Sequence, residues 1–442
     1  MNRKLILGLL IIAVIVTSGY FYFRKINSVP KQQQVEIDED INGYSLVDDM
    51  RLTQIVLQNE AHRAYCVGQN KKIELFANLF NSSSVTVLKD YKSRLPNNIN
   101  NDIKYFQYNL AFDYFLITAD EASLKEKPKV NSPVLATIAT LEKITLLQKV
   151  QAEQQEGSNI WYRVVLENNN EIKEGYIHSS QGTPRKFQFN KMQAEVADLQ
   201  KLLREGELHF IRNYKNYNGA SPRINNENVD EYGFRHTHSA PAYLQADINS
   251  SFRYIPDGIL VRVLEEINDF YYVNVPTFEG NYYVPKQYIN LNESLKQLKK
   301  VIVVDRSQQN EATFEVDNEQ LNLISYTIAT TGVKADYSFV TTLGMYKTLE
   351  KKDRFQYLKK GTSEIAGYAP YAIRFTGGAY THGVPVNYIV ENGEQKDPGH
   401  IEYLQTIGTF PRSSMCVRNF TSHAQFMYDW IDIENGAVIV IE

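Results

Sequence analysis

Cysteine is nearly absent from this sequence, which has two such residues, Cys66 and Cys416, among 442. Two cysteines so far apart exclude the disulfide framework that holds many small exported domains together. A strong excess of one charge is also missing, because 47 basic residues stand against 51 acidic ones and leave a net charge of -4. That balance excludes the basic composition of a nucleic-acid-binding protein. With 43% hydrophobic residues the chain can build packed cores, and its length predicts about three domains.

Charged residues are absent from one long stretch, Leu5 to Phe23, which contains 19 residues. As a helix rising about 1.5 Å per residue, this stretch nearly spans a hydrocarbon core of about 30 Å. Basic residues flank both ends, so their distribution leaves the orientation open. Residues 1–25 are predicted to be a transmembrane anchor or a cleaved signal segment, since Val16-Thr17-Ser18 resembles a cleavage site. In both cases we expect the remaining chain to be exported.

The segments that follow carry weaker patterns. Residues 26–43 are polar and lack an apolar period, so they are predicted to be a linker. Residues 44–113 are predicted to be a mixed, mainly helical region, and no motif indicates its role. Cys66 lies there among apolar neighbours and is interpreted as a buried small hydrophobe.

Residues 114–183 consist of short β-prone runs separated by turn residues, among them VLATI, KITLLQKV and IWYRVVL. The Trp-Tyr strand and the closing Gly-Tyr-Ile-His-Ser turn resemble those of a bacterial Src-homology-3-like domain. Trp161, Gly175 and Tyr176 carry this resemblance. It implies a small β-barrel.

Residues 235–293 repeat the same texture and are interpreted as a second, divergent Src-homology-3-like domain. Tyr271, Tyr272 and Tyr282 occupy the places of Trp and Tyr in the first copy. They are interpreted as core and ordinary surface aromatics. The alternative is a groove that stacks on sugar or peptide, as aromatic-lined grooves of related folds do.

Residues 184–234, between these two domains, are predicted to be a helix followed by a polar loop that act as a linker. The apolar positions of the helix recur at three- and four-residue spacing. They are Met192, Val196, Leu199 and Leu203. Just beyond, His236 and His238 could suggest a metal pair, but they lack a clear third ligand and are interpreted as a solvated loop. This pair therefore predicts no metal site.

The last segment, residues 298–442, is predicted to be a strand-rich domain with buried strands at VIVVD (301–305) and AVIVI (437–441). A helical face is formed near its end by Phe420, Ala424, Met427 and Ile431, with Thr421 or Ser422 as the N-cap. The predicted fold class is thus multidomain and mainly β with helical segments. It comprises an N-terminal transmembrane helix, two small barrels and a β-rich carboxy-terminal domain.

Cys416 lies in this domain just before the predicted helix, and its chemistry would depend on a neighbouring base. A thiolate rather than a thiol attacks an acyl carbon, and a histidine within hydrogen-bond reach can generate it. The domain offers His382, His400 and His423 as candidates. His423 falls inside the predicted helix and is expected at the surface, and His400 lies in a polar loop. His382 is favoured because Gly383 permits the sharp turn that holds and orients an imidazole.

The motifs RFTGGAYTHG and RSSMCVR resemble those of the L,D-transpeptidase family with a YkuD-like catalytic domain. His382 and Gly383 match the family's His-Gly, whereas Ser413, Cys416 and Arg418 match its Ser-x-Gly-Cys-x-Arg. TTLGMY at 341–346 and APYAIRFTGG resemble two further strand segments of that family, in the same order. Two features depart from the pattern: Met415 replaces the glycine before the cysteine, and residues 387–408 are interpreted as an inserted loop that could cap the site.

The resemblance implies acyl transfer on peptidoglycan stem peptides in cell wall biogenesis. Cys416 would attack the carbonyl of the third stem residue, a ring nitrogen of His382 would take the thiol proton, and the Gly383 carbonyl would fix the tautomer. The N–H groups of Met415 and Cys416 would hold the oxyanion. Arg418 would orient the site or form a structural ion pair.

The resemblance also implies that Ser413 hydrogen-bonds the loop, that carbapenems acylate Cys416, and that no metal or organic cofactor is needed. A side-chain amine of a neighbouring stem would resolve the thioester into a 3→3 cross-link.

Two other functions remain open from the sequence. An L,D-carboxypeptidase would resolve the same acyl-enzyme with water, and a non-catalytic wall-binding scaffold would carry a decayed site. In each case the chain is expected in the cell envelope, with its catalytic domain outside the cytoplasmic membrane and the barrels as wall-binding or spacing modules.

Overall fold

The computed structural model of the protein describes residues 85–108, 110–168, 171–278, 280–318, 320–336, 338–359 and 361–442. The expected anchor or signal segment at 1–25, the linker at 26–43 and Cys66 lie outside these residues. Within these ranges, no helix has both the length and the apolar character needed to cross a membrane.

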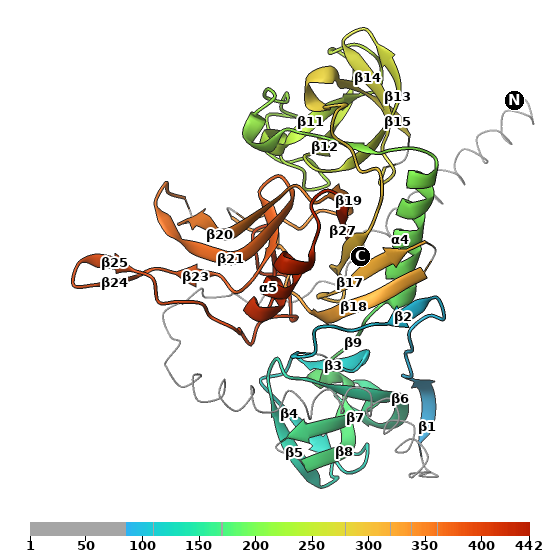
Figure 1. Cartoon of the computed structure of the whole chain (residues 1–442). Helices are drawn as coiled ribbons and strands as arrows, with labels where there is room; N and C mark the ends of the chain where they lie inside the picture. Colours follow the sequence, from blue (N-terminus) through green and yellow to red (C-terminus); the bar gives the residue numbers. More distant parts are fainter. Residues whose placement is uncertain are drawn as a thin grey trace, which may run out of the picture. The chain divides into compact units, whose positions relative to one another are not determined.

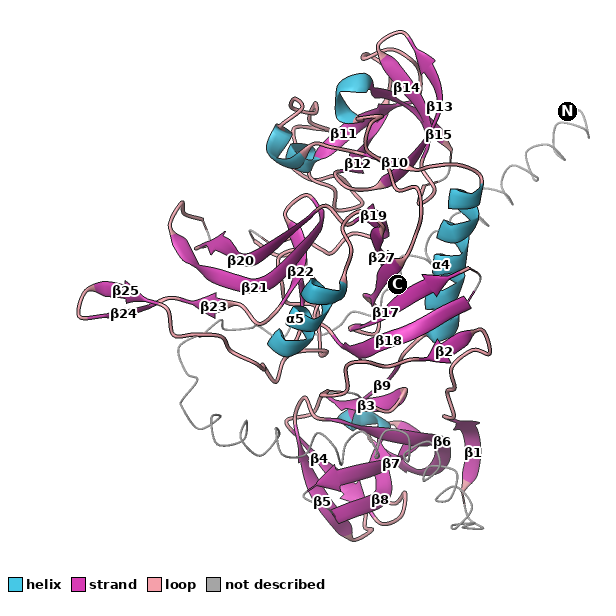
Figure 2. Cartoon of the chain, in the orientation of Figure 1, coloured by secondary structure: helices cyan, strands magenta, loops and turns pink. Residues whose placement is uncertain are grey.

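Strands dominate the described residues, as the sequence predicts, and Figure 2 shows the few helices among them. The two α-helices in these ranges are α4 (Phe189–Arg204) and α5 (Thr421–Trp430). Single 3₁₀ turns occur at η2 (Ser179–Gln181), η3 (Tyr214–Asn216), η4 (His236–His238) and η5 (Lys286–Tyr288). The mainly β character of the predicted fold class is confirmed.

The first sheet is antiparallel throughout and has the strand order β5-β4-β8-β7-β6-β3-β9, with β1 beside β6. Its strands are β1 (Thr86–Asp90), β3 (Asp113–Ile117), β4 (Glu121–Lys125), β5 (Val134–Ala139), β6 (Lys143–Gln155), β7 (Ser158–Asn168), β8 (Glu171–His178) and β9 (Gly182–Lys186). Trp161 is buried, and its indole N–H donates to the Glu153 carbonyl at 2.7 Å. This tryptophan is therefore core rather than surface.

Residues 85–108 and 110–113 contain two strands and no complete helix, so the prediction of a mainly helical segment is wrong for this part. β1 joins the first sheet, whereas β2 (Ile99–Asn101) pairs in parallel with β18 (Gln320–Ile328). Both strands obtain their backbone hydrogen bonds from distant partners, and such pairing overrides a weak local helical pattern.

The second sheet follows the order β10-β13-β14-β15-β11-β12. Its strands are β10 (His209–Phe210), β11 (Ser239–Tyr243), β12 (Phe252–Pro256), β13 (Leu260–Ile267), β14 (Phe270–Asn274) and β15 (Asn281–Pro285). Tyr282 is buried, whereas Tyr271 and Tyr272 are half-buried. His236 and His238 are also buried, at 8% and 7% exposure, so the expectation of a solvated loop there is wrong.

The third sheet belongs to the carboxy-terminal segment and has the order β19-β27-β16-β17-β18-β2. The strands not yet given are β16 (Lys300–Asp305), β17 (Asn310–Asp317), β19 (Gly344–Lys347) and β27 (Gly436–Ile441). β16 and β27 are parallel neighbours in its middle, at the two predicted apolar runs. Val301 and Ile439 face one core, whereas Ile302 and Val438 face another, which explains why both runs are continuously apolar.

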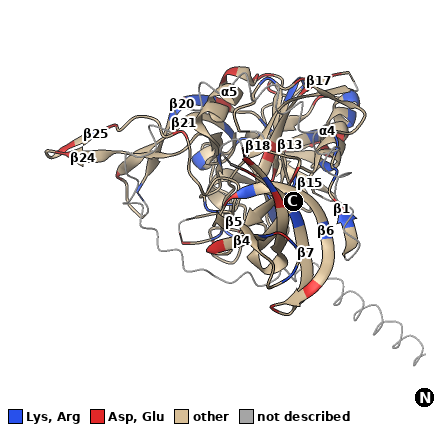
Figure 3. Ribbon diagram, turned by 90° about the horizontal axis from the view of Figure 1, so that it is seen from below, with Lys and Arg blue, Asp and Glu red and all other residues tan. Residues whose placement is uncertain are grey.

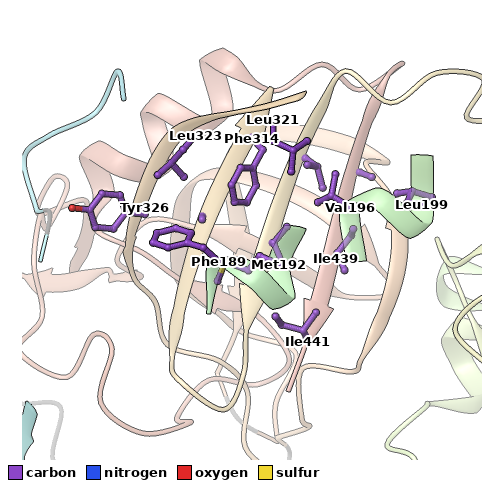
Figure 4. Packing of buried hydrophobic residues seen from close by; sticks show 14 of the residues in the cluster. Phe189, Met192, Val196, Leu199, Phe314, Leu321, Leu323, Tyr326, Ile439 and Ile441 are labelled. Atoms are coloured by element: carbon purple, nitrogen blue, oxygen red, sulfur yellow. The ribbon is translucent and has the colours of Figure 1, made fainter. Parts of the chain in front are cut away.

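Helix α4 packs on one face of this sheet and is not a mere linker. Its buried positions are Phe189, Met192, Val196 and Leu199, which confirms the predicted periodicity. Figure 4 shows them interleaved with side chains of β17, β18 and β27, including Phe314, Leu321 and Ile439. A polar linker would not need four buried apolar side chains, so the helix is part of the carboxy-terminal core.

The fourth sheet carries the order β20-β21-β22-β26, with β23 beside β21. Its strands are β20 (Glu350–Leu358), β21 (Ile365–Thr376), β22 (Ala379–His382), β23 (Val386–Asn387) and β26 (Val417–Arg418). Met427 of α5 shares a core with Ile373 and Val417 of this sheet and with Ile302 and Val438 of the third sheet. A separate hairpin, β24 (Ile389–Glu391) and β25 (Glu394–Lys396), extends beyond β23 (Figure 1).

If α4 belongs to the carboxy-terminal core, truncating a buried residue of this helix will destabilise that core. We expect Leu199→Ala to lower the free energy of unfolding by about 2–5 kcal/mol, because it leaves a cavity under the sheet. Urea unfolding followed by tryptophan fluorescence measures the change. Lys201→Ala, an exposed position two residues on, is the matched control. Equal midpoints for the two variants would contradict this role of α4.

Candidate active site

Two short parallel strands bring His382 and Cys416 together across 34 residues of sequence. β22 pairs with β26 so that Thr381 lies opposite Val417 and His382 opposite Arg418. Because side chains alternate between the faces of a strand, Tyr380, His382, Cys416 and Arg418 share one face. Val417, on the other face, is fully buried in the core between the two sheets. Of the three candidate histidines, His382 is the one whose strand pairs with the cysteine segment.

The His382 ring is buried at 4% exposure, and its Nδ1 lies 2.6 Å from the Gly383 carbonyl oxygen. A carbonyl only accepts, so Nδ1 carries the hydrogen and Nε2 is left with the lone pair. Burial lowers the pKa of His382 to about 4; the Gly383 bond raises it and the Arg418 charge lowers it further. At neutral pH the ring is therefore an uncharged base.

Gly383 is required because the backbone there has no room for a side chain. A Cβ at this position would lie 2.8 Å from Thr421 Oγ1 and 3.0 Å from Pro370 Cγ. The Gly383 amide also donates to the Pro370 carbonyl at 2.9 Å. Any larger residue would therefore shift the carbonyl that orients His382.

The Cys416 side chain is 7% exposed and packs against Ala372, Tyr380 and Phe355. Its Sγ lies 3.8 Å from the Gly378 carbonyl oxygen, to which it donates. Burial raises the pKa of Cys416 to about 11, and the Tyr380 backbone N–H and the Arg418 charge offset this only in part. The sulfur is thus a neutral thiol in this structure.

Met415 adopts a φ of +66°, the left-handed region in which glycine is favoured. Its amide donates to the Phe339 carbonyl at 2.7 Å, and its own carbonyl accepts from Thr341 Oγ1 at 2.8 Å. The expectation that the Met415 N–H holds an oxyanion is therefore not met in this structure, because the hydrogen is already committed. Ser413 does bond the loop as expected, since its hydroxyl donates to the Cys416 carbonyl.

Arg418 stands beside both reactive groups. Its guanidinium charge lowers the pKa of Cys416 and of His382, and it acts in the same direction on Tyr357. Its backbone is fixed by mutual hydrogen bonds with Thr330, at 2.8 and 3.0 Å. The cation favours a thiolate at Cys416 and disfavours an imidazolium at His382.

Asn419 supports this strand pair and was not recognised in the sequence. Its amide donates to the His382 carbonyl at 2.9 Å, and its side-chain nitrogen donates to Thr381 Oγ1 at 2.8 Å. His423 Nδ1 lies 3.3 Å from Asn419 Oδ1 and 3.2 Å from Glu311 Oε1. His423 is fully buried, so its predicted surface position is wrong. The four-residue spacing of Asn419 and His423 was the only signal in the sequence.

A second network missed in the sequence reaches Tyr380 from the second sheet. Asp257, which follows β12, accepts from Arg374 Nη1 at 2.5 Å, and Arg374 Nε donates to Glu350 at 2.8 Å. The same Glu350 oxygen accepts from the Tyr380 hydroxyl at 2.9 Å. Through these bonds Tyr380, which packs on Cys416, is connected to the region of the second sheet.

The inserted loop at 387–408 is anchored at two points. Asp397 accepts from Arg354 at 2.6 Å and from the Tyr368 hydroxyl at 3.0 Å. Glu402 accepts from the Ser422 amide at 3.0 Å, and so its carboxylate stabilises the start of α5. The N-cap position is Phe420, without a side-chain bond, rather than the predicted Thr421 or Ser422. His400 lies near the Tyr368 and Tyr371 rings in this loop.

The left-handed backbone at Met415 predicts an unusual order of stabilities. Met415→Ala and Met415→Gly both lose a buried side chain, which costs about 2–5 kcal/mol. Alanine additionally retains the positive φ, which a Cβ makes unfavourable by about 1–2 kcal/mol. We therefore expect the glycine variant to be more stable than the alanine variant by about 1 kcal/mol in urea unfolding.

The matched control for that comparison is Met427 in the interior of α5, which is also buried. There glycine should be the less stable of the two by about 1 kcal/mol, because it weakens a helix. The same order at both positions would rule out strain at Met415.

The pKa values of the pair predict how Cys416 reacts with iodoacetamide. With the thiol near 11 and the imidazole near 4, both groups are neutral between these values. The alkylation rate should then rise about tenfold per pH unit from pH 6 to beyond pH 9, in step with the thiolate fraction. Peptide mass spectrometry in a Cys66→Ser background measures it. A rate already constant between pH 6 and 8 would instead indicate a preformed thiolate–imidazolium pair.

One family of known proteins matches the segment that contains this site. Residues 299–441 match the L,D-transpeptidase catalytic domain, YkuD. No curated protein matches the chain.

Solved structures give weaker likenesses. An L,D-transpeptidase from Mycobacterium smegmatis is 14% identical, with 43% of this chain and 89% of that one covered, at a TM-score of 0.26. A second structure is L,D-transpeptidase 3 from Mycobacterium tuberculosis in complex with a faropenem-derived adduct. It is 18% identical, with 37% of this chain and 73% of that one covered, at a TM-score of 0.24.

A fused Zn-dependent amidase/peptidase/peptidoglycan-binding protein from Clostridium acetobutylicum is 17% identical over 32% of this chain, at a TM-score of 0.22. The chain spans about half of that protein, 51%. At these TM-scores the solved structures carry no argument of their own, and the assignment rests on the family match. The segment at residues 299–441 belongs to the YkuD family of L,D-transpeptidase catalytic domains.

Proposed function

We propose that this protein is a cysteine-dependent L,D-transpeptidase that acts on peptidoglycan stem peptides and forms 3→3 cross-links. The observation that carries the proposal is the pairing of β22 with β26, which sets His382 and Cys416 on one face of a sheet. The His382 Nδ1 bond to Gly383 leaves Nε2 as the base. A neutral thiol beside a neutral, oriented imidazole is a competent resting state for acyl transfer.

Acylation begins when the carbonyl of the third stem residue approaches Cys416. The thiol proton passes to His382 Nε2 while the S–C bond forms, because neither group ionises alone at neutral pH. Arg418 stabilises the developing thiolate. The His382 proton then goes to the nitrogen of the terminal D-alanine as the C–N bond breaks, and D-alanine leaves with a thioester on Cys416.

Deacylation completes the transfer. The side-chain amine of a neighbouring stem attacks the thioester carbonyl, an N–C bond forms, the C–S bond breaks, and the proton returns to sulfur through His382. With the Met415 amide committed to Phe339, we assign the oxyanion to the Cys416 N–H. One such donor is typically worth about 3–4 kcal/mol of transition-state stabilisation.

The remaining segments fit an envelope enzyme in this proposal. The amino-terminal segment holds or directs the chain to the membrane, with the catalytic domain on the wall side. The first and second sheets are Src-homology-3-like modules that bind or space the wall polymer. Figure 3 shows basic residues interspersed with acidic ones along the described ribbon, which suits a peptide and glycan partner better than a nucleic acid.

Carbapenem acylation tests the nucleophile. Intact mass spectrometry of the chain after meropenem treatment should show one adduct, which persists in Cys66→Ser and is lost in Cys416→Ser. His382→Gln should slow its formation by about 10²–10⁴-fold, because the general base is removed. An adduct that survives Cys416→Ser, or no adduct at all, would leave the wall-binding scaffold as the better function.

Stem tetrapeptides separate transfer from hydrolysis and are best followed in the same preparation. Cross-linked dimers with release of D-alanine are the expected products of the acylating enzyme. Tripeptides without dimers would identify an L,D-carboxypeptidase, because water and not an amine would then resolve the thioester.

A further inference from the structure

Thr421, the first residue of α5, uses its hydroxyl outside its own helix. A hydroxyl at the start of a helix commonly accepts from the first amides of that helix. Thr421 Oγ1 instead accepts from the Val384 amide at 3.0 Å and donates to the Ile401 carbonyl at 2.5 Å. The side chain is buried, at 4% exposure. Its two bonds therefore join the segment that follows His382 to the inserted loop.

The Val384 amide and the Gly383 carbonyl are the two ends of one peptide unit. Such a unit is planar and rigid, and in its trans form the N–H and the C=O point in opposite directions. Thr421 Oγ1 holds the N–H end, whereas the carbonyl end accepts from His382 Nδ1 at 2.6 Å. A hydroxyl that fixes one end of this unit therefore fixes the direction of the other end.

The Ile401 carbonyl determines how the Thr421 hydroxyl is oriented. A hydroxyl has one hydrogen and a carbonyl can only accept, so the hydrogen on Thr421 Oγ1 points to Ile401. A lone pair of the same oxygen is then left for the Val384 N–H. The Thr421 amide also donates to the Glu402 carbonyl at 3.1 Å, which keeps this part of the inserted loop against the start of α5.

Packing makes the Thr421 hydroxyl hard to replace. Val384 is fully buried in the core that contains α4, and the Gly383 amide is already used by the Pro370 carbonyl at 2.9 Å. Without the hydroxyl the Val384 N–H would lose its acceptor inside the protein, which is costly for a buried donor. A rotation of the peptide unit toward another acceptor would turn the Gly383 carbonyl away from His382.

A displaced Gly383 carbonyl would change the state of the His382 ring. The ring nitrogen that carries the hydrogen is set by the partner of Nδ1, so loss of this partner allows the hydrogen to sit on either nitrogen. The tautomer with its hydrogen on Nε2 has no lone pair there. It could not take the Cys416 proton at that atom.

We propose that Thr421 is a positioning residue for the base of the active site. With its hydroxyl oriented by Ile401, it holds the Gly383–Val384 peptide so that His382 keeps its hydrogen on Nδ1. That His382 acts as a base rests on the proposed function, whereas the control of its tautomer by Thr421 does not. The inserted loop then contributes to the site through the Ile401 carbonyl.

Nitrogen-15 NMR of the whole chain, labelled in histidine, tests the proposal. Long-range correlations at neutral pH report which ring nitrogen carries the hydrogen, and His382→Gln identifies the signals of this ring among 8 histidines. We expect the hydrogen on Nδ1 in the parent and in Thr421→Ser, which keeps the hydroxyl. The isosteric Thr421→Val should show a mixture with the hydrogen on Nε2. Its acylation by meropenem should be slower by about 10–10²-fold, with the parental rate retained in Thr421→Ser.

Thr409→Val is the matched control, because Thr409 is also buried and its hydroxyl donates to the Thr406 carbonyl at 2.7 Å. It should keep the parental tautomer and acylation rate. An unchanged tautomer in a folded Thr421→Val, or the same change in Thr409→Val, would overturn the proposal. If Thr421→Val does not fold, Thr421→Ala removes the same hydroxyl and gives the same comparison. A parent that meropenem does not acylate would refute the proposed function, and the tautomers would still decide the role of Thr421.

Discussion

The parallel pairing of β22 with β26 is the constraint on which the active site depends. It joins segments 34 residues apart, and its register decides that His382 and Cys416 share a face. A slip by one residue would turn one of the two side chains into the core. Asn419 secures that register by bonding both His382 and Thr381, and Val417 secures it by burial. The chemistry thus depends on a backbone arrangement more than on any single side chain.

Burial is the main influence on the protonation states of His382 and Cys416. The same packing that fixes Cys416 against Tyr380 keeps its thiol neutral, and the enclosure of His382 keeps the imidazole uncharged. The Arg418 charge opposes burial at Cys416, where it lowers the pKa of the thiol. At His382 it acts together with burial, because both lower the pKa of the imidazole. Both groups are therefore uncharged at neutral pH, which is the resting state from which the proposed acyl transfer would start.

Sequence patterns predicted the features that depend on residues close together in the chain, namely helix spacing, apolar strands and short motifs. The spacing in α4 was visible because burial of one helix face leaves a period. The runs of β16 and β27 were visible because burial of both strand faces makes them continuously apolar. The match of His382, Gly383 and Cys416 to a motif was visible because it depends only on residue identity and order along the chain. Met415 kept its motif position but not its expected role, since only the fold reveals that its amide bonds Phe339. The burial of His423 beside Glu311 was invisible because the two residues lie far apart in the sequence.

The limits of the family match do not coincide with the limits of the packed unit. Residues 299–441 match the catalytic-domain family, yet α4 covers one face of their sheet and β2 extends its edge from the amino-terminal side. Asp257 of the second-sheet region reaches Tyr380 through Arg374 and Glu350. Each of these contacts buries groups that would be costly to expose alone. The preceding segments are therefore structural parts of the catalytic unit, and a change in them can alter the environment of Cys416 without touching the motif.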